Sequence, residues 1–113
     1  MVVYNQTRSL PVATRARMAR SFGRRLRGLT GVPHLDVGEG LIIEPCNSVH
    51  TCFMRFPIDV FHVAEDGRVL RILHNLRPWR LGPVVRGSRY VVETPAGTAL
   101  ATGTHEGDIL FLD

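Results

Sequence analysis

The densest run of reactive and polar side chains lies between residues 44 and 59, which read Glu-Pro-Cys-Asn-Ser-Val-His-Thr-Cys-Phe-Met-Arg-Phe-Pro-Ile-Asp. If residues 50–55 are extended, alternate side chains share a face, with His50, Cys52 and Met54 on one and Thr51, Phe53 and Arg55 on the other. Pro57 interrupts strand pairing. We therefore expect the stretch to fold back there and to gather its polar side chains into one recess.

Metal binding is the first chemistry that this run suggests. Cys46, His50 and Cys52 supply thiolate and imidazole ligands of the kind that zinc prefers. Their C-x3-H-x-C spacing matches none of the common structural zinc sites, and only the distant His62 or His74 could supply a fourth ligand. We therefore expect no metal and no cofactor.

Thiol chemistry is the second possibility for residues 44–59. Cys46 or Cys52 could act as a nucleophile with His50 as its base, because a nearby imidazole lowers the pKa of a thiol. Residues two apart on a strand share a face, but their side chains seldom meet in hydrogen-bonding geometry. A hydrolase or thiol-dependent enzyme is therefore an alternative, and so is a Cys46–Cys52 disulfide, which a reducing compartment disfavours.

Ligand binding without a reaction is the third possibility. Arg55 offers a planar fork for a carboxylate or phosphate, and Asp59 could orient that fork or pair with it. Trp79 lies between Arg77 and Arg80 and could stack on a sugar or base, or cap the core.

Because no acid, base and nucleophile arrangement is evident, the leading hypothesis is a non-catalytic accessory domain that binds a ligand or partner. The expected occupant of its site is a small anionic ligand or a protein segment. The site residues we expect are Cys46, His50, Thr51, Arg55, Asp59, Trp79 and Glu93.

The charge is unevenly spread along the chain. Residues 1–35 hold seven arginines and no acid, whereas residues 36–113 hold the other seven arginines and all ten acids. The basic third could dock on the acidic remainder, or it could bind nucleic acid or another polyanion. Nucleic acid is the less favoured partner, because aromatic residues do not interleave with the basic set Arg15, Arg17, Arg24, Arg25 and Arg27.

Strands dominate the elements that must position these residues. Short β-branched and aromatic runs, or period-two alternation, predict strands over 2–5, 12–18, 40–44, 90–93 and 109–112. Asp66-Gly67 is a strong hairpin signal and predicts strands over 58–64 and 68–73. Residues 75–88 contain Pro and Gly at intervals and predict an irregular connection.

Two short helices complete the pattern. Ser21 can cap a helix whose Phe22, Leu26 and Leu29 form one apolar stripe, and Gly31 can end it. Gly23 and Gly28 weaken that helix, so it needs tertiary packing to persist. A Thr94-Pro95 start and Gly103 predict a second helix over 95–102.

Together these elements predict an α+β fold, mostly β, in the form of a compact mixed β-barrel or rolled sheet with one or two short helices. At 113 residues we expect one domain, residues 1–113. No apolar run approaches the roughly 18 residues of a membrane span, so we expect no membrane partner. The first twenty residues show no secretory signal, and we expect a cytoplasmic location.

Several segments, taken in order, resemble a known family. Arg27-Gly28-Leu29 is similar to an R-G-L-M turn, with Thr30 in place of methionine, and residues 40–43 are similar to a G-M-L-F strand. Residues 48–60, SVHTCFMRFPIDV, are similar to the signature aromatic-Met-Lys/Arg-x-x-Pro-Leu/Ile-Asp. Residues 90–97 and 107–108 are similar to the closing V-L-E-x-x-A-G and G-D.

Over nearly its whole length, then, the chain resembles the bacterial and archaeal family called domain of unknown function 192. The resemblance implies a compact β-rich fold and brings no established activity. Cys52 stands where an aromatic residue is common in the family, which argues against Cys52 as a shared nucleophile.

Overall fold

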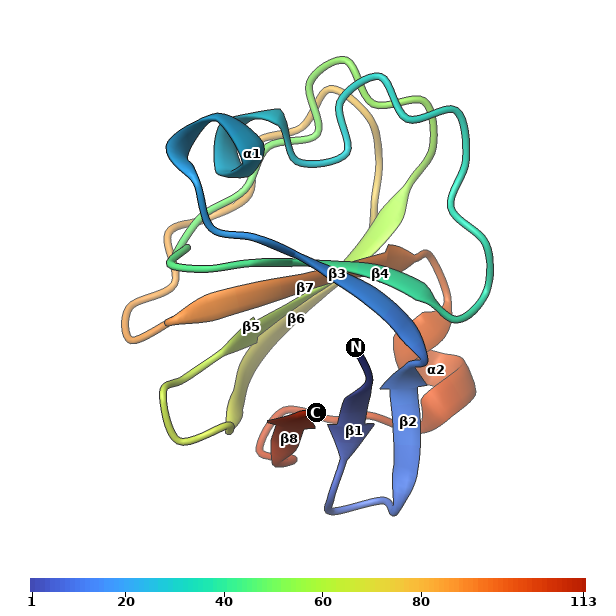
Figure 1. Ribbon diagram of the computed structural model, residues 1–113, viewed down its shortest axis with the longest axis vertical. Helices are drawn as coiled ribbons and strands as arrows, with labels where there is room; N and C mark the ends of the chain where they lie inside the picture. Colours follow the sequence, from blue (N-terminus) through green and yellow to red (C-terminus); the bar gives the residue numbers. More distant parts are fainter.

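Two sheets pack against each other in the computed structural model, which describes residues 1–113 (Figure 1). A three-stranded sheet has the order β2-β1-β8, and a five-stranded sheet has the order β3-β4-β7-β5-β6. Neither helix has the length and apolarity needed to cross a membrane. The elements are β1 (Val3–Asn5), β2 (Leu10–Ala13), β3 (Arg15–Ala19), α1 (Phe22–Arg27), β4 (Glu39–Ile43), β5 (Ile58–Val63), β6 (Val69–Leu76), β7 (Tyr90–Pro95), α2 (Thr98–Thr102) and β8 (Leu110–Leu112).

This architecture confirms the expected α+β, mostly β fold with two short helices, and the sheets do not close into a barrel. β3 and β4 are the one parallel pair, and every other strand pair is antiparallel. Parallel neighbours need a crossover connection. Here the crossover consists of α1 and the connection over residues 28–38 (Figure 1).

The single strand expected over 12–18 is wrong, because the chain changes sheets in its middle. β2 pairs with β1, whereas β3 pairs with β4. Val12 and Ala13 are both buried, so the period-two alternation stops at the change. The backbone N–H of Thr14 donates to the carbonyl of Gly38 at 2.9 Å. Gly38 has a φ of 92°, in the left-handed region that favours glycine, and a Cβ there would lie 2.9 Å from Oγ1 of the exposed Thr14 side chain.

The hairpin expected at Asp66-Gly67 is confirmed. β5 and β6 pair antiparallel on either side of it, and Asp66 Oδ1 accepts from the N–H of Arg68 at 3.1 Å. β6 continues to Leu76, beyond the strand end expected at residue 73. The irregular connection is correspondingly shorter than expected.

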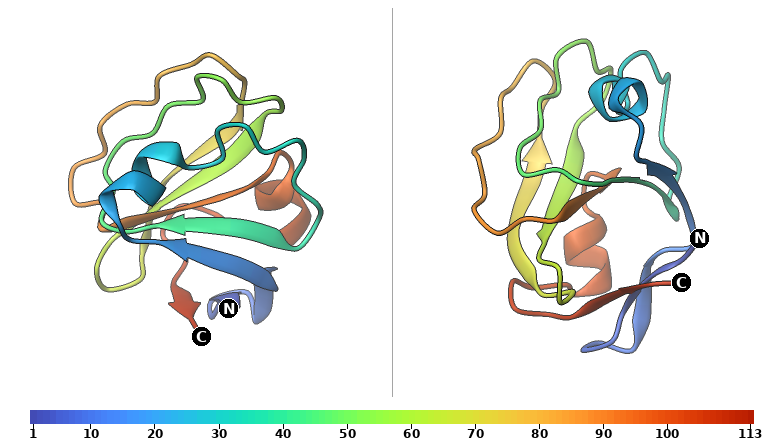
Figure 2. Two further views of the ribbon diagram at one scale, coloured as in Figure 1. Left: turned by 45° about the horizontal axis from the view of Figure 1, so that its top comes forward. Right: turned by 60° about the vertical axis from the view of Figure 1, so that its left-hand side comes forward.

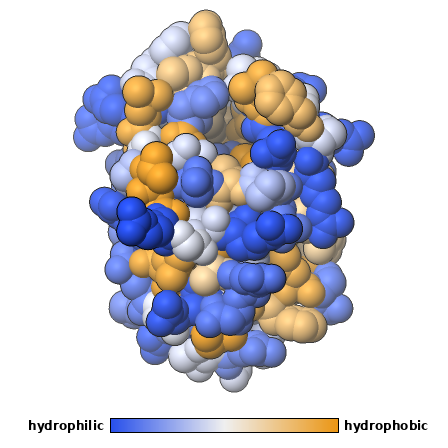
Figure 3. All heavy atoms as spheres, turned by 90° about the vertical axis from the view of Figure 1, so that its left-hand side faces the viewer, coloured by the Kyte–Doolittle hydropathy of each residue, from blue (hydrophilic) through white to orange (hydrophobic).

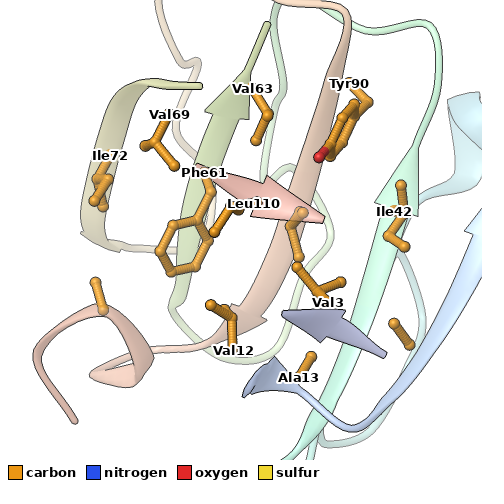
Figure 4. Close-up of a cluster of buried hydrophobic side chains, with 13 residues drawn as sticks. Val3, Val12, Ala13, Ile42, Phe61, Val63, Val69, Ile72, Tyr90 and Leu110 are labelled. Carbon is orange, nitrogen blue, oxygen red and sulfur yellow. The ribbon is translucent and has the colours of Figure 1, made fainter. Parts of the chain in front are cut away.

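Both faces of the five-stranded sheet are covered. Along β7, Tyr90 and Val92 face the three-stranded sheet, and Val91 belongs to the core on the opposite face. The cluster between the sheets contains Val3, Val12, Ala13, Ala16, Ile42, Phe61, Val63, Val69, Ile72, Tyr90, Val92, Ala99 and Leu110 (Figure 4).

The second cluster lies on the face that carries α1 and the connections over 28–38, 44–57 and 77–89, which gather on one side of the sheet (Figure 2). It has fewer buried members and is covered mainly by irregular chain. Its buried residues are Ala19, Leu29, Leu41, Ile43, Met54, Ile58, Val60 and Val91.

α1 begins as expected and ends early. Ser21 Oγ accepts from the N–H of Arg24 at 3.2 Å, as a cap should, but the helix ends at Gly28. The expected packing of its apolar stripe is wrong for Phe22 and Leu26, which are 74% and 63% exposed. Only Leu29, beyond the helix, is buried.

α2 begins at Thr98, later than expected, and ends at Gly103 as expected. The strand β7 runs on through Pro95, which pairs with β5, so the helix cannot begin there. The carboxylate of Asp59 then accepts from the N–H groups of Gly97 and Ala99, at 3.2 and 2.9 Å. A distant residue therefore caps this helix, and no local pattern could reveal it.

Candidate functional site

A pocket of about 280 Å³ lies between α1 and the segment 45–50 that follows β4. Ile43 and Glu93 form its floor, Phe22 and Leu26 stand on the α1 side, and residues 45–50 form the facing wall. The space-filling view of the side of the molecule that carries α1 shows apolar patches interspersed with hydrophilic ones across its upper half (Figure 3). Because α1 follows β3 and residues 45–50 follow β4, the pocket lies where these two parallel strands end.

Glu93 is the most unusual group in this pocket. Its neighbours across the sheet are Leu41 on β4 and Val60 on β5, so apolar residues flank the carboxyl group. The residue is 2% exposed, and its Oε1 has no hydrogen-bond partner in the protein. Burial raises its pKa from 4.5 to about 8. At neutral pH the carboxyl group is therefore mostly protonated and can donate a hydrogen bond.

Arg25 lines the same pocket from α1. Its Nη1 donates to the carbonyl of Pro45 at 3.2 Å, which ties the helix to the facing wall. Its Nε is buried and has no partner in the protein, and Arg25 forms no ion pair with Glu93. Buried polar atoms almost always have a hydrogen-bond partner. The protein has three such unpaired side-chain atoms: His62 Nε2 lies outside this pocket, whereas Arg25 and Glu93, which carry the other two, both line it.

Cys46 is half-buried on the wall opposite α1. Its Sγ donates to the carbonyl of Ser48 at 3.1 Å. Burial raises the pKa of the thiol, the bond to Ser48 lowers it, the nearby Glu93 raises it and Arg25 lowers it, with a net rise. The thiolate is the nucleophilic form of cysteine. This environment therefore disfavours the reactive form.

His50 stands exposed at the mouth of the pocket. Its Nδ1 accepts from the backbone N–H of Cys52 at 3.2 Å, so in the neutral ring the proton is on Nε2. No hydrogen bond joins His50 to either thiol, and the two cysteines are not bridged. The cysteine–histidine pair that the thiol-enzyme alternative requires is therefore not formed.

Thr51 and Asp59 do not line the pocket; their side chains hydrogen-bond backbone groups elsewhere in the fold. Thr51 Oγ1 donates to the carbonyl of Arg77 and accepts from the N–H of Arg80 at 2.9 Å, which joins two long connections. Asp59 lies next to Ile58 and Val60, whose side chains belong to the pocket side of the sheet, so alternation turns Asp59 to the other side. There it accepts backbone N–H groups around α2.

Arg55 and Trp79 also lie outside the pocket. Arg55 is exposed and forms no ion pair with Asp59. Trp79 is 59% exposed and meets Phe53 edge to face, with ring centroids 4.6 Å apart. The expected single recess therefore forms only in part.

The structure brings three of the expected site residues into one pocket: Cys46, His50 and Glu93. Sequence reasoning placed Arg25 only in a basic stretch and missed its position in the pocket. The available signals were the apolar Phe22 and Leu26 within that arginine-rich stretch, and the R-G-L turn after them. No group of three or more His, Cys, Asp or Glu side chains is arranged to hold a metal ion.

Comparison with known proteins gives a family and a fold. The family model DUF192, described as Uncharacterized ACR, matches residues 3–112. A UPF0127 protein from Thermococcus sibiricus is 29% identical over 111 residues, which cover 95% of this chain and 71% of that protein. A UPF0127 protein from Pyrococcus furiosus is 40% identical over 63 residues, which cover 56% of this chain and 53% of that protein.

A crystal structure of a protein of unknown function from Novosphingobium aromaticivorans has the same fold. Its TM-score is 0.86 at 24% identity, and the match covers 98% of this chain and 82% of that one.

Proposed function

The chain belongs to the DUF192 family, and we propose that it binds a small anionic ligand in the pocket between α1 and residues 45–50. In this proposal the domain is a binding module and carries out no reaction. The ligand's negative group lies on the pocket floor, between Arg25 and Glu93.

One observation carries the proposal. Arg25 Nε and Glu93 Oε1 are both buried, both lack a protein partner, and both residues line this pocket. Leaving a buried polar group unpaired costs about 1–3 kcal/mol, and more for a charged group. A ligand whose polar atoms hydrogen-bond these groups recovers that free energy, so the pocket favours a polar or charged occupant.

The charge state favours an anion. Arg25 is cationic, and the protonated Glu93 offers an O–H donor and adds no negative charge at neutral pH. A carboxylate or phosphate oxygen can accept from both. Hydrogen bonds to an ionised acceptor are roughly twice as strong as neutral ones.

The surroundings also favour an anion. Arg24 and Arg27 on α1 are exposed close to the pocket, and residues 45–58 contain no acidic residue. A mouth with positive charge on one side raises the local concentration of an anion and its association rate. Thiol catalysis has less support, because Cys46 donates to a backbone carbonyl and its pKa is raised.

The test is a thermal-shift and calorimetric titration with acetate, inorganic phosphate and the neutral analogue acetamide at pH 6.5. An anion should raise the melting temperature of the wild-type protein, since a ligand that binds only the native state stabilises it. Arg25→Leu should lose the shift, with affinity reduced roughly 10- to 100-fold, the equivalent of a charged hydrogen bond. The matched control is Arg24→Leu, which removes the same charge from the exposed face of α1.

A second arm varies the pH. Anion affinity of the wild type should fall as the pH rises above about 8, because ionised Glu93 repels the ligand. Glu93→Gln, which stays neutral, should lose that dependence while it keeps binding at pH 6.5. Equal losses in Arg24→Leu and Arg25→Leu, or no response to any anion, would overturn the proposal.

A further inference from the structure

We propose that the ligand of this pocket is an amphiphilic monocarboxylate, a small carboxylic acid whose other half is an alkyl or aromatic group. The inference rests on the proposed function, because its carboxylate is the anion that Arg25 and Glu93 hold. What it adds is the chemistry of the tail and the role of α1.

The first support is the unpartnered apolar stripe of α1. Phe22 and Leu26 are 74% and 63% exposed, and both line the pocket. The helix has six residues and buries none of them. A helix this short gains most of its stability from tertiary packing, which α1 lacks on this face. An apolar tail in the pocket supplies that packing.

Three further apolar residues extend the apolar surface that Phe22 and Leu26 form on α1. Leu29 and Ile43 are buried members of the core cluster beneath α1, and the half-buried Val49 packs against that cluster. All three also line the pocket. The cavity thus combines an apolar surface on the α1 side with polar groups at Glu93 and along residues 46–50. Sites that orient a ligand by a few polar groups on apolar walls have this mixed lining.

The size of the cavity sets the size of the ligand. Its volume is about 280 Å³. At ~30 Å³ for each water-sized group it accommodates roughly nine such groups. A carboxylic acid of about six to eight carbons fills that space.

The charge at the floor favours a single negative charge. Arg25 Nε is the one buried cationic donor there, and the neighbouring Glu93 carboxyl can contribute only a neutral donor. Arg27 also lines the pocket but is exposed to solvent. A second negative charge on the ligand would be buried without a partner, which is strongly unfavourable. A monocarboxylate therefore fits better than a phosphate dianion.

The experiment is a two-dimensional NMR titration with straight-chain carboxylates from acetate to octanoate at pH 6.5. Affinity should rise about fourfold for each added methylene until the tail fills the cavity. Leu26→Asn should flatten this rise, with the largest loss of affinity for octanoate and the smallest for acetate. Leu100→Asn is the matched control, because Leu100 is 86% exposed on α2 and lies outside the pocket. Hexylamine, with the same tail and a cationic head, should not bind.

The outcomes separate this inference from the proposed function. Acetate binding at Arg25 with no gain along the series would overturn the amphiphilic ligand and leave the anion site standing. No response at Arg25 and Glu93 to any carboxylate or to inorganic phosphate would remove both. Equal slopes in Leu26→Asn and Leu100→Asn, or a concentration-dependent dimer that buries Leu26, would show that α1 does not hold the tail.

Discussion

A Cβ placed on Gly28 would lie 3.8 Å from Oε1 of Glu93, so the turn that ends α1 rests against the buried carboxyl group. The same Cβ would lie 3.8 Å from Ile43 Cδ1, in ordinary contact. Gly28 has a φ of 51° and a ψ of −126°, a backbone conformation that glycine adopts readily and other residues do not. A glycine therefore lies where the end of α1 contacts the pocket floor.

Gly28→Ala should destabilise the protein by about 1–2 kcal/mol, because alanine is strained at this φ. It should also weaken anion binding, since the added methyl group narrows the approach to Glu93. Urea denaturation and the acetate titration measure the two effects. Gly23→Ala is the control: it lies within α1 with open space around its Cβ, and it should stabilise by up to about 1 kcal/mol. A stabilising effect at both positions would contradict the strain argument.

The free energy of unfolding should depend on pH through Glu93. Its folded pKa of about 8 lies above the unfolded value near 4.5, so between these values the folded state binds one more proton than the unfolded state. Stability should therefore fall as the pH rises across this window, by at most about 1.4 kcal/mol per unit, and level off on either side. Glu93→Gln should remove this contribution. Urea titrations of both proteins at pH 5, 6.5 and 8 give the difference, and parallel curves would be incompatible with a buried, unpaired carboxyl group.

Cys46 should react slowly with iodoacetamide at pH 7.5, because burial raises its pKa and little thiolate is present. Measuring the labelling rate in Cys52→Ser isolates Cys46, and an unstructured cysteine peptide gives the reference rate. A bound carboxylate should slow labelling further, since Cys46 lines the pocket. Labelling faster than the peptide would restore the thiol-enzyme alternative.

Asp59→Ala should destabilise the protein by about 3 kcal/mol or more, because the N–H groups of Asn75, Gly97 and Ala99 lose their acceptor. Asp59→Asn, which keeps one side-chain acceptor, should cost less. Asp113→Ala, at an exposed position with no side-chain hydrogen bond, should be nearly neutral. Anion affinity of the folded Asp59→Asn protein should match the wild type, since Asp59 faces away from the pocket; a large loss would assign Asp59 to the site.

Sequence reasoning succeeded where a feature depends on neighbouring residues. The Ser21 cap, the hairpin at Asp66-Gly67 and the stop at Gly103 each follow from residues within one turn of chain. It failed where a distant residue decides the structure. The change of sheets at Thr14 depends on Gly38.

The candidate site shows the same limit. The types and spacing of Cys46 and His50 placed them near one another, and the pocket contains both. Alternation along β5 turned Asp59 to the opposite face, which a proline bend alone does not reveal. Glu93 lacks a polar partner because its neighbours across the sheet are apolar. Arg25 lies in the pocket because α1 packs beside the segment that follows β4. Both are tertiary facts.

The crossover between β3 and β4 also bears on how proteins with this sheet can diversify. Most of one pocket wall comes from residues 22–30, which belong to no strand. Insertions and substitutions in this crossover can therefore reshape the cavity while the ladder of strands stays intact. Ligand preference and architecture can evolve separately here, and two relatives with superimposable sheets need not recognise the same molecule.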